Sequence, residues 1–213
     1  MTTKTDTSDF LQKESDSIDE TIKNFLKENG VFELSKDEQI VKVAKLIADI
    51  PWGKSRTVEE LLVLKKYGTC TAKHSALQRC YNLLGIKSHQ VVSTFKWSEQ
   101  GISYPENLQK ILAEGEWDHG HNFLQVENRD GEVIDVDVTW NPSLLEYGFK
   151  SLPEDWDGET SFLGLKIDQR WENVDMKTKK IELIESLSPE LRERREKFLE
   201  LFVEWIHSIN HTF

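Results

Sequence analysis

Three residue types follow one another along the chain in an order that suits thiol chemistry: a cysteine, a histidine and an aspartate. Cys70 stands where a helical pattern of apolar residues begins, His121 stands at the start of an expected strand, and Asp137 lies on the next one. Free N–H groups and the helix dipole at a helix N-terminus favour the thiolate form of a cysteine. A thiolate can attack an acyl carbon while a histidine moves the proton and a carboxylate orients the imidazole. The order therefore predicts a Cys70, His121, Asp137 arrangement for acyl chemistry.

The helix that must position Cys70 is predicted from the spacing of apolar residues. They recur close to the 3.6-residue period at Ala72, Ala76, Leu77, Cys80, Leu83 and Leu84. Gly85 then stands where a C′ glycine ends a helix. Backbone N–H groups at the start of this helix could form part of an oxyanion hole. The alternative interpretation is that Cys70 is a small packed residue, since free cysteines are often buried.

A hairpin is expected to bring His121 and Asp137 together. Residues 122–127 and 132–138 alternate in polarity on either side of Asn128-Arg129-Asp130-Gly131, a turn sequence. If these strands pair, His121 and Asp137 lie near the same end of the sheet. Two rivals remain open: Asp135 as the orienting carboxylate and His119 as the base. The Asp-Val-Thr-Trp context favours Asp137, and Gly120 disfavours a strand that begins before His121.

A zinc site is the second chemical alternative. Cys70 and His74 are spaced i, i+4 on one helix face, and Asp118-His119-Gly120-His121 could supply further ligands. Beyond the helix pair, the spacing matches no recognised zinc motif. We therefore expect neither a metal nor a cofactor, and we expect His74 to line the cleft or to pack near it.

Helices are predicted on both sides of this central segment. Residues 1–15 are polar and are expected to be disordered, and a short amphipathic helix follows. Capping boxes at Ser35 and Thr57 open two more helices. Residues 176–211 read as two helices separated by Ser188-Pro189. We expect one domain over residues 16–213, with a core at about 35–165 and a C-terminal helical extension at about 176–211.

Composition excludes several classes of protein. A net charge of −11 over 213 residues argues against a nucleic-acid partner held through phosphate contacts. No segment approaches the roughly 20 apolar residues of a membrane span. Two cysteines cannot form a disulfide framework, and the polar segment Met1 to Asp9 lacks the apolar core of a signal peptide. A cytoplasmic protein with reduced thiols and no membrane partner is the expectation.

The residues around these three positions resemble the transglutaminase-like superfamily of papain-like cysteine enzymes. In that family a Gly-x-Cys sequence begins a helix rich in Ala and Leu, and a Gly-Ile step leads into a strand. Here the corresponding residues are Gly68-Thr69-Cys70 and Gly85-Ile86. The family's His-Ala-Trp-x-Glu-Val corresponds to the segment from His121 to Val126, and its Asp-Pro-Thr corresponds to Asp137-Val138-Thr139. The resemblance covers about Leu61 to Pro142.

This resemblance implies an α+β fold in which the nucleophile helix packs on an antiparallel sheet, with extra helices at both ends. It implies Cys70, His121 and Asp137 as the catalytic triad. The implied activity is that of a cysteine peptidase or amidase, or acyl transfer to an amine, on a peptide or protein amide substrate. The alternative is a non-catalytic member of the fold that binds a peptide or protein.

Overall fold

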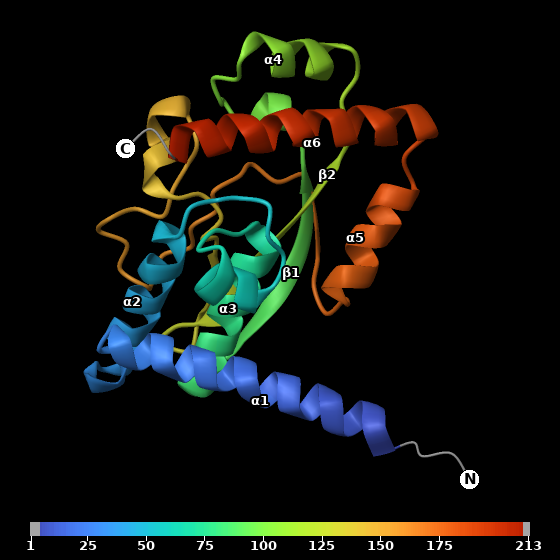
Figure 1. The fold of residues 1–213 in the computed structure, drawn as a ribbon. Helices are drawn as coiled ribbons and strands as arrows, with labels where there is room; N and C mark the ends of the chain where they lie inside the picture. The colour runs from blue at the N-terminus through green and yellow to red at the C-terminus, as the bar shows by residue number, and fades with distance from the viewer. Residues whose placement is uncertain (1–4, 211–213) are drawn as a thin grey trace.

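The computed structural model describes the backbone of residues 5–210 and the side chains of residues 17–210. Within that range the sheet has four antiparallel strands in the order β3-β2-β1-β4. The strands are β1 (Ser88–Phe95), β2 (His119–Glu127), β3 (Val133–Val136) and β4 (Gln169–Trp171). Helices surround this sheet (Figure 1), so the predicted α+β fold is confirmed. Among the described residues, none of the helices combines the length and apolarity needed to span a bilayer.

Helix α3 (Cys70–Leu83) packs against β1 and β2 and begins at the cysteine, as predicted. Gly85 has a φ of +68° just after its end, a conformation that glycine adopts at the C′ position without strain. The helix also contacts α1 (Thr5–Glu28) and α2 (Lys36–Asp49). The predicted capping box opens α2, where the Ser35 N–H donates to Glu38 Oε2 at 2.9 Å. These three helices enclose a largely aliphatic core together with β2 and β3.

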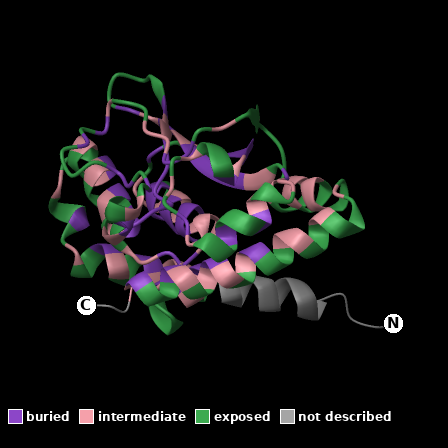
Figure 2. Cartoon of the chain, turned by 90° about the horizontal axis from the view of Figure 1, so that it is seen from above, coloured by how far each residue is buried: buried purple, intermediate pink, exposed green. Residues whose placement is uncertain are grey.

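A second, aromatic core lies beneath the C-terminal helix α6 (Pro189–Asn210), which packs against α4 (Glu106–Ala113). Its buried rings come from segments far apart in the sequence: Trp52, Phe95, Trp97, Tyr104, Trp117, Trp140, Phe149, Phe198 and Phe202. Figure 2 shows the buried residues gathered in the interior of the molecule, between exposed helix faces. The C-terminal helix is therefore built into the core rather than attached to its surface.

A set of asparagine hydrogen bonds ties the end of α6 to this aromatic core. Asn210 Nδ2 donates to the Trp52 carbonyl at 3.1 Å, across 158 positions of the sequence. Asn141 Nδ2 donates to Asn210 Oδ1 at 3.0 Å, and Asn141 Oδ1 accepts the Trp52 N–H at 2.8 Å. Three distant segments are thus held at one point, which we call the asparagine clamp.

Helix α5 (Met176–Glu185) lies apart from both cores and has no buried residue, yet it packs against β1 and β2. In the view of Figure 1, α3 and α5 lie on either side of β1. The segments that connect these helices and strands contain short helical turns at Val31–Glu33, Glu60–Leu64, Trp97–Glu99 and Pro142–Tyr147.

Several expected boundaries differ from the structure. Strand β2 begins at His119, not after Gly120, because β1 pairs with it as far as Phe95 opposite His119. Strand β3 ends at Val136, so Asp137 lies just beyond it. Strand β4 was missed because three residues show too little alternation to identify a strand.

Two further differences concern the N-terminal helices. The third predicted helix is only a short π-helical turn at Glu60–Leu64. Its expected capping box is half formed, because Glu60 Oε2 accepts from the Arg56 N–H instead of reaching back to Thr57. The disorder expected for residues 1–15 is wrong from Thr5 onward, where α1 begins, and residues 1–4 lie outside the described residues. Leu11 continues the apolar spacing of Ile18 and Phe25, which favours this longer helix.

Candidate active site

The backbone before Cys70 is fixed by a brace from the loop at residues 51–55. Gly53 N–H donates to the Gly68 carbonyl at 3.3 Å, and Gly68 N–H donates to the Pro51 carbonyl at 3.0 Å. Gly68 is required here by packing, because a Cβ at this position would lie 2.5 Å from Leu61 Cδ1 and 3.0 Å from Ala72 Cβ. The brace therefore fixes the direction in which α3 starts.

Thr69 is the N-cap residue of α3, but its side chain does not cap the helix. Its hydroxyl donates to the Ser55 carbonyl at 2.8 Å instead. The positive end of the helix dipole is consequently not capped by Thr69, and it acts on Cys70, the first residue of α3. Cys70 is a free, partly exposed cysteine.

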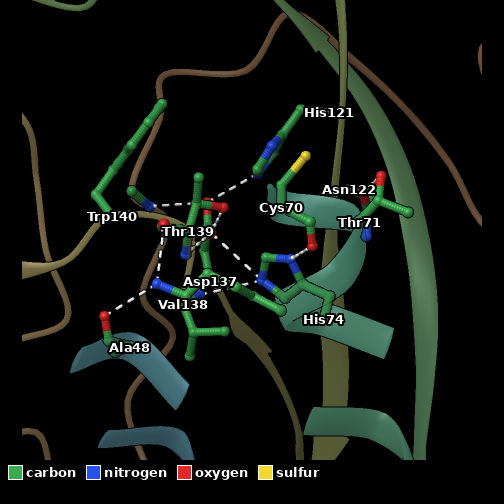
Figure 3. A network of polar contacts seen from close by, with 12 residues as sticks. Ala48, Cys70, Thr71, His74, His121, Asn122, Asp137, Val138, Thr139 and Trp140 are labelled. Carbon is green, nitrogen blue, oxygen red and sulfur yellow. Dashed lines mark hydrogen bonds and ion pairs between the residues drawn. The ribbon is translucent and has the colours of Figure 1, made fainter. Parts of the chain in front are cut away.

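The Cys70 sulfur faces the imidazole of His121, and Figure 3 shows the two side chains turned toward each other. Burial raises the pKa of the Cys70 thiol, but the Lys180 ammonium and the hydrogen bond and charge of His121 lower it by more, to about 5. The thiolate is therefore the favoured form at neutral pH. Cys80, deep in the aliphatic core, shows the opposite behaviour: burial raises the pKa of its thiol to about 12.

His121 is held by Asp137 on its other side. The distance from His121 Nε2 to Asp137 Oδ2 is 2.9 Å, and both side chains are almost completely buried. Because a carboxylate only accepts hydrogen bonds, Nε2 carries the proton and Nδ1 remains for the sulfur. Burial lowers the pKa of His121, yet Asp137 and the Cys70 thiolate raise it by more, to about 9.

The Asp137 carboxylate is anchored by its own loop. Oδ1 accepts from the Thr139 N–H at 2.9 Å and from the Thr139 hydroxyl at 2.6 Å, and Oδ2 accepts from the Gly164 N–H at 3.2 Å. Burial raises the pKa of Asp137, but the charge and hydrogen bond of His121 hold it well below its usual range. The carboxylate stays ionised and fixed in orientation.

Two side chains of α3 connect this loop to the helix. His74 Nδ1 donates to the Cys70 carbonyl at 2.8 Å, and His74 Nε2 accepts the Val138 N–H at 3.0 Å. Lys73 is fully buried, and its Nζ donates to the carbonyls of Ala48, Ile50 and Thr139 at 2.9, 2.8 and 3.1 Å. Burial lowers the pKa of Lys73 to about 7, although Asp137 and Asp49 raise it.

The two rival residues have other partners. Asp135 forms a two-pronged ion pair with Arg170, at 2.9 and 3.2 Å, away from the imidazole of His121. His119 packs against the rings of Phe95 and Trp97, and its Nδ1 accepts from Trp117 Nε1 at 3.2 Å. Burial, assisted by nearby cations, holds the pKa of His119 well below its usual range. Neither residue contributes to the Cys70 cluster.

The hydrogen bonds of His74 also bear on the predicted zinc alternative. One ring nitrogen donates to a carbonyl and the other accepts a backbone N–H, so His74 has no lone pair left for a metal. Over the described residues, no group of three or more His, Cys, Asp or Glu side chains is arranged to hold a metal ion. The geometry therefore gives the zinc interpretation no support.

Sequence reasoning missed Lys180 and Asn122. Lys180 Nζ lies 3.6 Å from Cys70 Sγ, 3.0 Å from Thr71 Oγ1 and 2.5 Å from Asn122 Oδ1. Lys180 belongs to a run of lysines on α5, and nothing in the spacing tells which of them points inward. By contrast, the bond from the Thr139 N–H to Asp137 has a local signal, because an Asp often accepts from the N–H two residues on.

Comparison with known proteins finds no matching family model and no matching curated protein. The chain is similar to a solved structure titled "Crystal structure of a TGase", with a TM-score of 0.44 and 12% sequence identity. The match covers 60% of this chain and 33% of that one, so the chain spans about a third of the matched structure. At this TM-score and identity, the likeness carries no argument about the family or the activity of the chain.

Proposed function

We propose that this protein carries out thiol-dependent acyl chemistry on an amide or peptide, by hydrolysis or by transfer to an amine. Cys70 is the nucleophile, His121 is the general acid and base, and Asp137 orients the imidazole. A peptide or protein amide is the proposed substrate class. The two free thiols suit a reducing compartment such as the cytoplasm.

One observation carries the proposal: Cys70 faces His121, and His121 donates to a buried Asp137 whose carboxylate accepts from three further donors. A structural histidine would need no ionised carboxylate behind it and no cysteine in front of it. Because burial is expensive for an ionised group, this buried charge cluster supports a role in chemistry.

The geometry supports a two-step reaction. Cys70 Sγ attacks the acyl carbon and the carbonyl electron pair moves to oxygen. When that pair returns, the C–N bond breaks and the proton on His121 Nδ1 passes to the leaving nitrogen. His121 then takes a proton from water, or from an amine, as that molecule attacks the thioester and releases the thiol.

The pH profile of this chemistry should be bell-shaped. As pH falls through about 5, Cys70 takes up a proton and the nucleophile is lost. As pH rises through about 9, His121 loses its proton and can no longer protonate the leaving group. The two limbs belong to the coupled pair rather than to either residue alone.

A burst experiment tests the nucleophile without knowledge of the natural substrate. Mixed with excess 4-nitrophenyl acetate, the protein should release nitrophenolate in a burst equal to the enzyme concentration, with an acetyl group on Cys70 by mass spectrometry. C70A should lose the burst and C80A should keep it. A burst that survives C70A would contradict the proposal.

A peptide library then identifies the amide. Mass spectrometry after incubation separates backbone cleavage from loss of ammonia, and a fluorescent primary amine in a parallel reaction reports acyl transfer. Each product should depend on Cys70 and on His121. Products that persist in C70A would count against this assignment.

The second candidate function is a binding module that uses the fold without turnover. The position of Lys180 favours it, because its ammonium lies 3.6 Å from Cys70 Sγ and occupies space beside the thiol. In that case C70A should bind a peptide ligand as well as the unaltered protein does, and no burst should be observed with either.

A further inference from the structure

Helix α5 is held over the start of β2, although it buries no residue of its own. A Cβ built on Gly120 would lie 3.5 Å from Leu183 Cδ1 and 3.6 Å from Lys180 Cγ, so the helix rests directly on this glycine. The preceding residue, Lys179, has a different partner: its Nζ lies 4.5 Å from the centre of the Trp171 ring. Lys180 is thus directed toward Cys70 by the way the helix is seated.

The acceptor beside Lys180 is fixed by a chain of amide side chains. Asn122 Nδ2 donates to Gln90 Oε1 at 3.1 Å, and Gln90 Nε2 donates to Gln78 Oε1 at 3.1 Å. Since an amide nitrogen only donates and an amide oxygen only accepts, this chain sets the orientation of Asn122. Its oxygen is left to accept from Lys180 at 2.5 Å.

The charge of Lys180 is directed at the thiol. The hydrogen bonds of its ammonium within the described part of the chain go to Cys70 Sγ, the Thr71 hydroxyl and the Asn122 amide oxygen, and neither oxygen carries a charge. The other titratable groups that interact with the thiol are His121 from β2 and, from α3, His74 and the buried Lys73, which is bonded to three carbonyls. Lys180 therefore places a positive charge beside Cys70 from α5, a helix that carries no residue of the predicted triad.

We propose that Lys180 is a catalytic residue that stabilises negative charge at Cys70. Before reaction its ammonium stabilises the thiolate. The second half of the role rests on the proposed function: when Sγ attacks an acyl carbon, the new oxyanion is two bonds from Sγ, within reach of an ammonium 3.6 Å from that sulfur. Lys180 donates a hydrogen bond to this oxygen and keeps its proton, while His121 protonates the leaving nitrogen.

Alkylation of Cys70 tests the first half without any substrate. The variants are K180M, which removes the charge, K180R, which keeps it, and K177M, a control at an exposed lysine of the same helix. Rates of reaction with neutral iodoacetamide and with anionic iodoacetate are followed against pH, and the modified cysteine is located by mass spectrometry. Thermal melts of all variants check folding, which a partly exposed position on α5 should tolerate.

We expect K180M to raise the pH midpoint of Cys70 alkylation by about 1 to 3 units, the usual effect of losing an opposite charge at this range. The rate ratio of iodoacetate to iodoacetamide should fall in the same variant. K180R should restore both properties and K177M should change neither. An unchanged midpoint and ratio in K180M would overturn the proposal, as would faster alkylation at all pH values, because Lys180 would then only block the thiol.

The burst with 4-nitrophenyl acetate tests the second half and separates the two proposals. A burst slowed in K180M and restored in K180R supports the oxyanion role. A normal burst in K180M that is absent in C70A overturns the role of Lys180 and leaves Cys70 as the nucleophile. A shifted alkylation midpoint without any burst in the unaltered protein overturns the proposed acyl chemistry and leaves Lys180 as the cation that stabilises the thiolate.

Discussion

The two ends of α3 present the same residue type in opposite chemical states. At the N-terminal end, Cys70 lies among polar side chains and the pKa of its thiol is about 5. Ten residues later, Cys80 is fully buried in the aliphatic core and its pKa is about 12. Burial raises the pKa in both cases, so burial does not distinguish them. The difference comes from cations on other elements, His121 and Lys180, which reach only the first position.

The largest expected effect is on alkylation of the two thiols in the same molecule. At pH 7 the thiolate fractions that follow from pKa values of about 5 and about 12 differ roughly 10⁵-fold, and only a thiolate reacts quickly. Iodoacetamide should therefore modify Cys70 in the folded protein and leave Cys80 intact, as measured by peptide mass spectrometry. H121A should slow the reaction of Cys70 alone. The comparison fails if both thiols stay inert until the protein unfolds, or if they respond alike to pH.

Removing the charge of Asp137 should give the next largest effect. D137N keeps the shape of the side chain but loses the main interaction that raises the pKa of His121, so the alkaline limb should move below about 9. Turnover should fall roughly 10⁴-fold, as expected when a buried orienting carboxylate is lost. D135N is the matched control, because Asp135 lies two residues before Asp137 but pairs with Arg170, so its loss should leave the pH profile unchanged. Equal losses in both variants would point to general damage instead.

Lys73, three residues after Cys70 on α3, should affect stability more than the state of either thiol. K73M leaves three carbonyl groups without their donor, so the free energy of unfolding should fall by about 3 kcal/mol. Urea denaturation measures this change against K42M, an exposed lysine of α2 whose loss should cost less than about 0.5 kcal/mol. A similar small effect at both positions would show that the buried ammonium is not needed to join α2 to the Asp137 loop.

The smallest expected effects come from serine substitutions of the two cysteines, which should rank in opposite orders for stability and for activity. C80S places a hydroxyl in an apolar core and should lower the free energy of unfolding by about 1 to 3 kcal/mol with little change in activity. C70S should abolish activity and change stability by less than about 0.5 kcal/mol, because the position is partly exposed. Urea denaturation and the nitrophenolate burst, measured on both variants, should rank them in opposite orders.

Local patterns predicted the elements of the site better than its electrostatics. The helix beginning at Cys70 and the β2–β3 hairpin follow from apolar spacing and turn residues, which act over a few positions. The start of β2 at His119 depends on pairing with Phe95 of β1, a partner that the local sequence does not reveal. The contact of Lys180 with the thiol could not be predicted from the local sequence. Helix α5 carries several lysines, and tertiary packing decides which one meets Cys70.

The asparagine clamp also has a consequence for the order of events during synthesis. Its closing bond joins Trp52 to Asn210, and Lys180 follows Cys70 by 110 positions. At roughly 5–20 residues per second, a ribosome needs about 5–20 s to extend the chain from the cysteine to this lysine. Throughout that interval the nascent thiol lacks one of its cations, and the aromatic core cannot close before α6 emerges. Late translation of the last helices thus delays the reactive state of Cys70 until the chain around it is nearly folded.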